Sequence, residues 1–524
     1  MDVIDIGLFS SRIDAVCDEM GVVLRRASFS PNIKDRMDFS CALFDAKGQL
    51  CAQAAHIPVH LGSMAYAMAD IVSRFQWLDG DMLILNDPYL GGTHLPDITV
   101  IAPLFAPGCA SPVGFVANRA HHANIGAHSP GSMPVSQSLE EEGLLISPEF
   151  LIRDNWLNQA LIKQFADIDK DNADFSEPGK DLIQGDLQAQ VSANKVGLQR
   201  LVGLVTEKGE AEFIRGLEAL NIYGERLARH TLNKIPDGEY GFTDYMDDDG
   251  QGSQNIEIRA LIKVDSSNVI VDFTGTSRQV AGNINCPLSV AAAAVFYVFR
   301  CLMPTHTPAC AGSFKPIKIL AQEGSLVNAI RPAAVAAGNV ETSMRLVDVI
   351  LGALQKAIPD QIPAASYGSM NNIAMGYESS KNQPGWDYYE TLGGGMGAGS
   401  QGKGLSTVQA HMTNTLNTPV ESLELHYPVR IKRYQIRYGS GGEGLFNGGD
   451  GLVREYEFLS PAHVTLLTER RLIQPWGLQG ACNGQVGVNT LSEKNLPPKI
   501  SFKVEEGDSL CIETPGGGGW GELK

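Results

Sequence analysis

The residues with the clearest chemical potential are a histidine and an aspartate three positions apart, His94 and Asp97, in the stretch NDPYLGGTHLPDITV (residues 86–100). Pro96 stiffens the corner between them, and two glycines ahead of it let the backbone turn. A second stretch, NRAHHANIGAH (residues 118–128), adds the adjacent pair His121 and His122. Residues of these types at this spacing indicate more than a connecting loop.

This set of residues is typical of a metal site, because imidazole and carboxylate groups are the usual ligands of zinc, manganese and iron. Adjacent residues of a strand point to opposite faces, so only one of His121 and His122 should join His94 and Asp97. A three-ligand site leaves a position for water, whose pKa a metal lowers towards neutrality. The residues alone leave a second interpretation open, namely separate histidines satisfied within the core or in turns.

The elements expected around these residues place them where strands end. Apolar spacing predicts helices over residues 6–26 and 61–75. FSCALFDAKGQLCAQ (39–53) predicts two strands around a turn, and DMLILND (81–87) predicts a buried strand that leads into the histidine stretch. Strands are also expected in DITVIAPLF and PVGFVANRAHH, on either side of the next turn.

The rest of the chain predicts a mixed architecture. A long amphipathic helix is expected over 212–236, a hairpin over 256–277, and two further helices over 287–303 and 341–358. The predicted fold class is α+β, with a multi-layer mixed α/β catalytic region and a β-rich C-terminal region. The expected regions are 1–135 with the metal site, 136–240 with helices, 241–400 with α/β structure and 401–524 with mostly strands.

Composition excludes several classes of partner. Acidic residues outnumber basic ones by 59 to 41, and a net charge of −18 argues against nucleic acid or an anionic membrane. The nine cysteines are scattered and form no C-x-x-C pair, as in reduced cytosolic proteins. The N-terminus lacks the features of a signal peptide, and the apolar run 289–299 is too short to span a bilayer. A cytoplasmic location is therefore expected.

Three glycine-rich stretches are similar to nucleotide or anion sites but do not meet their requirements. GAGSQGK (397–403) has P-loop spacing, yet Gly404 stands where Ser or Thr would bind magnesium. In GGTH (91–94), Tyr89 occupies the place of the aspartate of an actin-like phosphate turn. PGGGGWG (515–521) is better explained as a tight turn. We find no G-x-S-x-G elbow either, so neither an ATP site nor a serine hydrolase is expected.

Many blocks of the chain resemble, in order, those of the hydantoinase B/oxoprolinase family, over nearly the whole length. They include RMDFSCALFDAKGQLCAQ, HIPVHLGSM, NDPYLGGTHLPDITV, NRAHHANIG, GDLQAQVSANKVGLQRL, GNVETSMRLVDVILGAL, AHMTNTLNTPVESLELHYPVR, ERRLIQPWGLQG and IETPGGGGWG. This family contains the B-type subunits of N-methylhydantoinase and of ATP-dependent 5-oxoprolinase and lactamases, and the alpha subunit of acetone carboxylase. One departure precedes His411, where Ala410 stands in place of the family's second histidine.

The resemblance implies a division of labour between two subunits of a hetero-oligomer. A hydantoinase A-type ATPase subunit would use ATP to phosphorylate the carbonyl oxygen of a small cyclic amide, which removes the amide resonance. The present chain would contain a divalent metal (zinc, manganese or iron) and hydrolyse the activated ring, as an amidohydrolase acting on 5-oxoproline, a hydantoin or a lactam. Chain length favours this over an alpha-type subunit of a ketone carboxylase, and a non-catalytic scaffold for the A-type subunit is the third hypothesis.

The resemblance also assigns metal ligands. His94 and Asp97 match the family's H-x-x-D pair, and we take His122 of the RAHH block as the third ligand. Asp38, in the MDFS block, is the candidate fourth ligand, with capping of the following turn as its alternative role.

Two further histidines are candidates for catalytic roles. His121 is expected to transfer protons or to hydrogen-bond behind the ligands, with packing behind its strand as the alternative. His60, in HIPVHLGSM, is expected to line the same pocket or to orient the helix that follows it.

Overall fold

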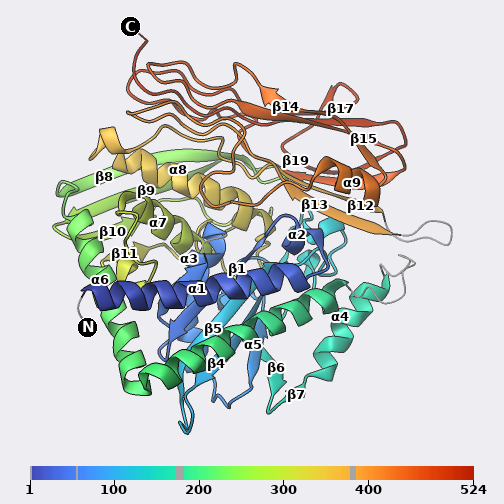
Figure 1. Cartoon of the computed structure of the whole chain (residues 1–524). Coiled ribbons are helices and arrows are strands. Elements are labelled where there is room, and N and C mark those ends of the chain that lie inside the picture. The colour runs from blue at the N-terminus through green and yellow to red at the C-terminus, as the bar shows by residue number, and fades with distance from the viewer. Residues whose placement is uncertain (1–2, 55–56, 172–181, 378–384, 524) are drawn as a thin grey trace.

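The computed structural model describes residues 3–54, 57–171, 182–377 and 385–523. Helices and four separate sheets combine in three stacked regions, which confirms the α+β prediction (Figure 1). The N-terminal sheet and its helices lie at the bottom of the view, a smaller sheet with two helices in the middle, and the C-terminal strands at the top. Among the described residues, no helix combines the length and apolarity that crossing a membrane requires.

The N-terminal sheet is antiparallel throughout, with strand order β2-β1-β5-β4-β3-β6-β7. Its apolar runs are buried on both faces, because alternate residues of β1 pack towards α1 and α5 on one side and towards α3 on the other. Strands on both sides of residue 135 belong to this one sheet. The elements are β1 (Phe39–Asp45), β2 (Leu50–Ala54), β3 (Met82–Leu85), β4 (Asp97–Phe105), β5 (Pro112–His121), β6 (Glu149–Arg153), β7 (Trp156–Leu157), α1 (Val3–Ala27), α2 (Pro31–Lys34), α3 (Pro58–Ser73), α4 (Gln159–Asp171) and α5 (Leu182–Lys208).

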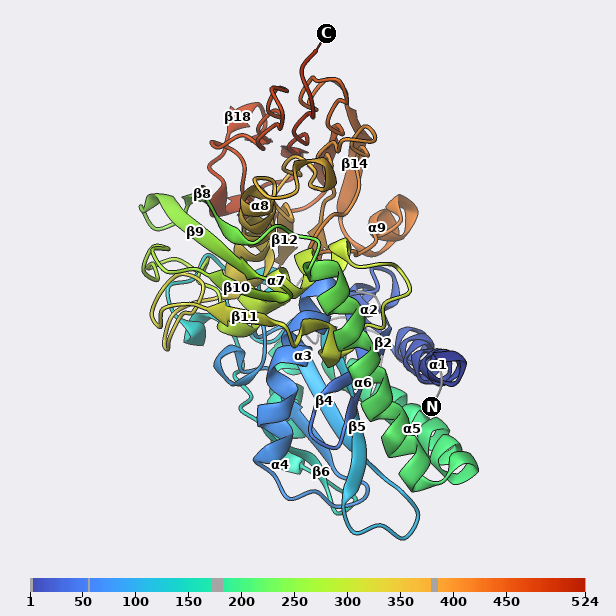
Figure 2. The same cartoon turned by 90° about the vertical axis from the view of Figure 1, so that its left-hand side faces the viewer.

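The middle region is a four-stranded sheet, β11-β10-β9-β8, that packs against two helices (Figure 2). The expected hairpin is present as β9 and β10, which are joined by the two residues Ser266 and Ser267. The expected buried helix forms as α7, which crosses α3 so closely that a Cβ on Gly62 would lie 2.5 Å from the Ala293 Cα. The elements are α6 (Glu210–Leu232), β8 (Gly238–Asp248), β9 (Gln254–Asp265), β10 (Asn268–Asp272), α7 (Leu288–Leu302), β11 (Ile317–Leu320) and α8 (Ser343–Leu354).

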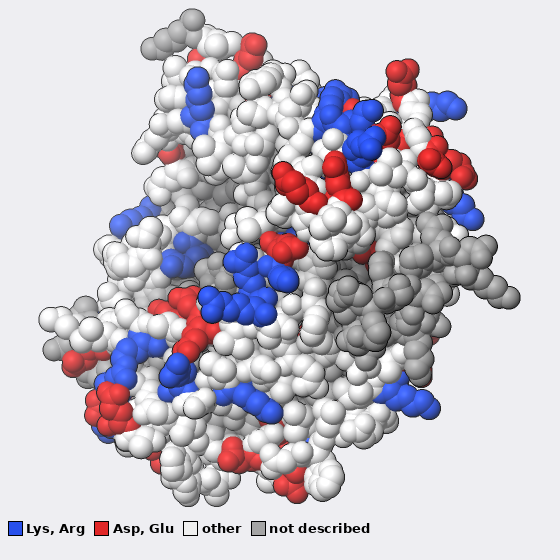
Figure 3. Space-filling view, turned by 45° about the vertical axis from the view of Figure 1, so that its right-hand side comes forward, with Lys and Arg blue, Asp and Glu red and all other residues white. Residues whose placement is uncertain are grey.

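The C-terminal region contains two sheets, ordered β13-β12-β16-β19 and β14-β15-β20-β17-β18, with an apolar core between them. On the face in Figure 3, basic and acidic side chains lie among one another. The elements are β12 (Asn372–Tyr377), β13 (Trp386–Thr391), α9 (Val420–His426), β14 (Val429–Arg437), β15 (Gly451–Phe458), β16 (Ala462–Leu467), β17 (Val488–Leu491), β18 (Lys494–Asn495), β19 (Lys499–Val504) and β20 (Ser509–Glu513).

Glycine-rich segments between these strands pack backbone against backbone. The Gly449 amide donates to the Met396 carbonyl oxygen (2.8 Å), and the Gly517 amide donates to the Gly449 carbonyl oxygen (2.9 Å). A Cβ on Gly449 or Gly517 would lie 1.9 or 2.1 Å from a neighbouring carbonyl oxygen. Gly517 of the stretch 515–521 therefore has a structural explanation, and so does Gly397 at the start of 397–403, whose Cβ would lie 1.9 Å from the Ala364 carbonyl oxygen: only glycine permits this approach.

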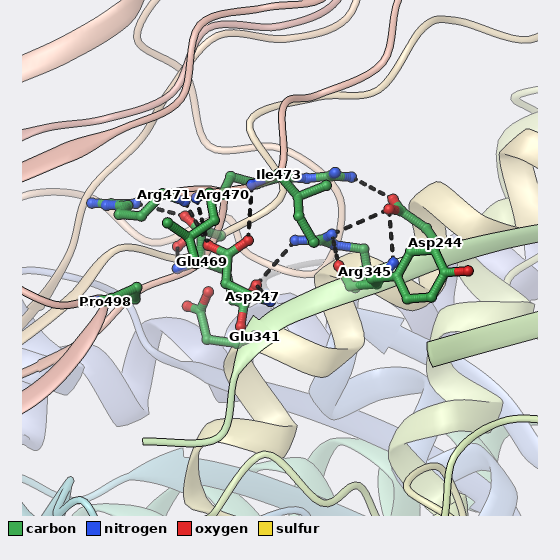
Figure 4. Close-up of polar contacts among 12 residues, drawn as sticks. Asp244, Asp247, Glu341, Arg345, Glu469, Arg470, Arg471, Ile473 and Pro498 are labelled. Atoms are coloured by element: carbon green, nitrogen blue, oxygen red, sulfur yellow. Dashed lines mark hydrogen bonds and ion pairs between the residues drawn. The ribbon is translucent and has the colours of Figure 1, made fainter. Parts of the chain in front are cut away.

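Buried charges join the C-terminal region to the middle one (Figure 4). Arg470 donates through Nη2 to Asp244 Oδ2 (2.8 Å) and Asp348 Oδ2 (2.6 Å), and Arg345 Nη2 lies 3.1 Å from Glu469 Oε2. These five side chains are buried. Because ions removed from water must be paired, the cluster allows only one docking of the C-terminal region on β8 and α8.

Substitution of Gly517 by alanine is expected to destabilise the protein. The new Cβ would meet backbone atoms of Met396, which cannot rotate away, so we expect a loss of about 1–3 kcal/mol or more in the free energy of unfolding. Gly399→Ala is the matched control, because nothing lies within 4 Å of its Cβ position. Scanning calorimetry of both variants checks this; an equal Tm for Gly517→Ala and the wild type would contradict the described packing.

Removal of the buried Arg470 guanidinium is expected to lower the free energy of unfolding more than removal of an exposed guanidinium. Arg470→Met leaves Asp244 and Asp348 without their cation in the interior, at a cost of about 3–5 kcal/mol. Arg200→Met breaks an exposed pair with Glu19 and should leave the stability unchanged. Urea unfolding of the two variants compares these effects, and similar midpoints would show that the buried cluster does not stabilise the fold.

Candidate metal centre

Two neighbouring strands bring the first two candidate residues together. Asp97 is the first residue of β4 and His121 the last residue of β5, and the two are direct cross-strand partners. Direct partners project from the same face of an antiparallel sheet, so the carboxylate and the imidazole lie side by side. The strands that hold them run next to each other in Figure 2.

The turn before β4 adds His94. Gly91 has a φ of 109°, and a Cβ on Gly92 would lie 2.3 Å from the Asn86 carbonyl oxygen, so both positions require glycine. The Asp97 amide donates to the His94 carbonyl oxygen (3.1 Å), which closes the corner expected around Pro96. This turn therefore places the His94 side chain next to that of Asp97.

The three side chains surround a space that suits one ion. One ligand atom from each of His94, Asp97 and His121 lies within 4.8 Å of the other two. His94 Nε2 is 3.3 Å from Asp97 Oδ1, and the two imidazole centroids are 5.1 Å apart. All three residues are no more than 2% exposed.

Surrounding hydrogen bonds occupy the outer atoms of this group. Asp97 Oδ2 accepts from Thr93 Oγ1 (2.5 Å) and Asn339 Nδ2 (3.4 Å) and lies 3.2 Å from His60 Nε2. His94 Nδ1 lies 3.3 Å from a backbone carbonyl oxygen, which can only accept, so this nitrogen carries a proton. Burial lowers the pKa of His94, but Asp97 outweighs it and raises that pKa, so a metal at Nε2 would take the place of a proton.

The inward-facing atoms, in contrast, have no hydrogen-bond partner among the residues that the structure describes. Buried polar atoms without a partner are rare in proteins and call for an explanation. Here they are metal-binding atom types within reach of one ion, so the donor set fits a divalent metal. These atoms are His94 Nε2, Asp97 Oδ1 and His121 Nε2.

The electrostatics of the group favour a cation. Burial raises the pKa of Asp97, but His60 and His94 outweigh it and hold that pKa well below its usual value, so the carboxylate is ionised. Burial and the neighbouring His94 hold the pKa of His121 well below its usual value. His121 is therefore neutral near pH 7, the form in which imidazole binds metals.

A small cavity of about 20 Å³ is lined by His94 and His121 and has room for one ion or water molecule. Several residues that line this cavity were not identified as site residues from the sequence. Asn339 comes from a π-helical turn (Gly338–Thr342), Tyr389 from β13, and Thr413 and Thr415 from the loop before α9. The GNVETSMR and AHMTNT blocks contained three of them, but without a recognisable chemical motif.

The structure places His121, and not the predicted third ligand His122, beside His94 and Asp97. His122 lies beyond the end of β5, and its Nε2 is 3.0 Å from Gln190 Oε1 of α5. His121 rather than His122 faces His94 and Asp97, because the cross-strand register with Asp97 fixes which of the two adjacent residues shares its face.

The other two predicted residues lie at the edge of the group. His60, in the first turn of α3, lines the cavity and contacts Asp97. Asp38 lines it as well, but its carboxylate lies 3.9 Å from His60 Nε2 and 3.7 Å from the Arg36 guanidinium, and it is not one of the three clustered ligands. Burial raises the pKa of Asp38, although Arg36 opposes the shift.

Elemental analysis of three histidine variants tests this centre. The purified chain, reconstituted with a divalent metal, should contain about one ion per chain. His94→Ala and His121→Ala should lose it, whereas His122→Ala should keep it, because His122 faces α5. Retention of metal by His121→Ala together with its loss from His122→Ala would contradict the geometry.

Comparison with known proteins agrees with the resemblance in the sequence. A family model described as hydantoinase B/oxoprolinase matches residues 2–523. 5-Oxoprolinase 1 of Arabidopsis thaliana is 40% identical over 99% of this chain, which spans only 42% of that protein. The putative B-type subunit of the D-/L-hydantoinase of Pseudomonas sp. (strain NS671) is 31% identical over 99% of this chain and 90% of its own length.

Solved structures share the fold. The ATP-dependent caprolactamase from Pseudomonas jessenii superposes with a TM-score of 0.90 at 25% identity, over 100% of this chain and 91% of that one. An acetone carboxylase chain superposes with a TM-score of 0.82 at 17% identity, over 98% and 74%, and this shows a common fold alone. The chain belongs to the hydantoinase B/oxoprolinase family.

Proposed function

We propose that the chain is the metal-containing part of an ATP-dependent cyclic-amide hydrolase. It hydrolyses a ring whose carbonyl oxygen a hydantoinase A-type ATPase has phosphorylated. The observation that carries the proposal is the set of unpartnered, buried ligand atoms of His94, Asp97 and His121, in a chain of this family. The names of its relatives, which include a 5-oxoprolinase, a hydantoinase and a caprolactamase, support the substrate class.

The lengths of the relatives support an ATPase partner. The chain spans less than half of the plant 5-oxoprolinase but 90% of the hydantoinase relative, which is named as one subunit of its enzyme. We assign the ATP-dependent step to the part of the plant 5-oxoprolinase that this chain does not match. For the present chain, an A-type ATPase subunit in a hetero-oligomer is the proposed source of this step, because the hydantoinase relative is named as one subunit of its enzyme.

The residues of the centre have distinct tasks. His94, Asp97 and His121 would hold the metal, which when bound supplies Lewis acidity and lowers the pKa of a water molecule. His60 holds a proton at Nε2, 3.2 Å from Asp97 Oδ2, and so keeps the other carboxylate oxygen turned inward. Zinc, manganese and iron all suit this donor set.

The cavity wall keeps bulk water away from the reacting atoms. Ile57, Val59, Val340, Met370 and Met412 form its apolar part. A phosphorylated amide is a strong electrophile, so exclusion of stray water confines attack to the water at the centre. Thr413 and Thr415 provide hydroxyl groups on the same wall, where they can hydrogen-bond a water molecule in the cavity.

Two other hypotheses make different demands. A ketone carboxylase would share the fold but would need bicarbonate and would leave cyclic amides intact. A scaffold for the A-type subunit would have no use for three buried ligand side chains with unpartnered atoms, which favours the hydrolase.

Reconstitution with an A-type subunit tests the proposed reaction. The two subunits are given ATP, a divalent metal and one of three cyclic amides: 5-oxoproline, a hydantoin or caprolactam. They should release the ring-opened acid from at least one of these amides. His94→Ala should abolish ring opening while the partner still hydrolyses ATP, and His122→Ala should retain activity. Ring opening by His94→Ala at the wild-type rate would support the scaffold instead. Product formation only from a ketone and bicarbonate would support the carboxylase.

A further inference from the structure

Tyr389 of β13 reaches from the C-terminal region to the metal centre. Its ring stacks on that of His121, with centroids 4.8 Å apart and planes 7° apart, and the residue is only 3% exposed. The second side-chain torsion of a histidine has broad preferences of its own. A parallel aromatic ring at this distance limits that torsion, so it constrains the direction of His121 Nε2.

Arg36 holds Tyr389 from the N-terminal region. Its guanidinium carbon lies 4.8 Å from the Tyr389 ring centroid, and Nη1 donates to the Tyr389 carbonyl oxygen (2.8 Å). Nη2 donates to Thr391 Oγ1 (3.3 Å), two residues further along β13. A planar guanidinium makes both the ring contact and the directed bonds, which a lysine ammonium cannot reproduce.

The far end of the Tyr389 side chain is fixed as well. Its hydroxyl donates to Asn372 Oδ1 (2.7 Å), and the Asn372 amide donates to Glu341 Oε1 (2.7 Å). Both of these partners are buried. The ring therefore has little freedom to move away from His121.

Asn32 completes the surroundings of His121. Its amide nitrogen Nδ2 lies 3.2 Å from His121 Nδ1, and its Oδ1 accepts from Arg36 Nη1 (3.3 Å). In this arrangement Nδ1 accepts a hydrogen bond and the neutral imidazole carries its proton on Nε2, so a metal at Nε2 would require the proton to move to Nδ1 and the Asn32 amide to turn. The stacked ring of Tyr389 directs Nε2 towards His94 and Asp97 in either case.

We propose that Tyr389 is a positioning residue of the metal centre and that, held by Arg36, it orients His121 as a ligand. This inference rests on the proposed function, because it takes the three clustered side chains as a metal site. Groups that orient a ligand typically contribute about 10–100-fold to metal affinity. The C-terminal sheet then strengthens metal binding, although none of the three clustered side chains belongs to it.

Zinc affinity of the full chain tests the inference, measured by competition with a chromophoric chelator and without substrate or ATP. Tyr389→Leu should bind Zn²⁺ about 10–100-fold more weakly. Tyr389→Phe keeps the stacked ring and should stay close to the wild type. Tyr388→Leu is the matched control, since Tyr388 is equally buried on the same strand but packs on Tyr427 (5.0 Å between centroids) in the other core.

The outcomes separate this inference from the proposed function. Equal weakening by Tyr388→Leu and Tyr389→Leu would show a general loss of packing and would overturn the positioning role. Wild-type affinity in Tyr389→Leu would overturn it too, while leaving the metal centre intact. Failure of the unsubstituted chain to bind Zn²⁺, Mn²⁺ and Fe²⁺ alike would overturn both proposals.

Discussion

The burial of the Asp97 carboxylate is the constraint on which the site depends. A carboxylate without water must be compensated by hydrogen bonds and positive charge. Thr93, Asn339 and His60 satisfy one oxygen, and each comes from a different element. The other oxygen faces two imidazole nitrogens that also lack partners among the described residues. The proposed divalent cation would satisfy all three atoms at once and would account for the burial of so polar a group.

The centre also depends on packing that lies outside it. The buried ions around Arg470 hold the C-terminal region on β8 and α8, and the backbone contacts of Gly449 and Gly517 join segments within that region. That region supplies Tyr389, together with the threonines of the cavity wall. A site that appears in the sequence as an N-terminal motif is therefore completed by segments that follow it by more than two hundred residues.

Periodicity and turn chemistry predicted the strands beside the site and the corner between His94 and Asp97. They could not decide between His121 and His122, because alternation places the two on opposite faces without saying which face holds Asp97; only the register does so. Nor did they outline α5, whose buried face has polar residues such as Gln190 and Asn194 among its apolar ones. Tyr389 and Asn339 reach the site through contacts between distant segments, which no local pattern encodes.

The most direct test of the account is the position of the metal itself, located by anomalous scattering from a crystal of the metal-loaded chain. The account predicts a single peak at about 2.0–2.2 Å from His94 Nε2, His121 Nε2 and an Asp97 oxygen. A peak bound by His122, or strong peaks only at other places on the chain, would contradict it.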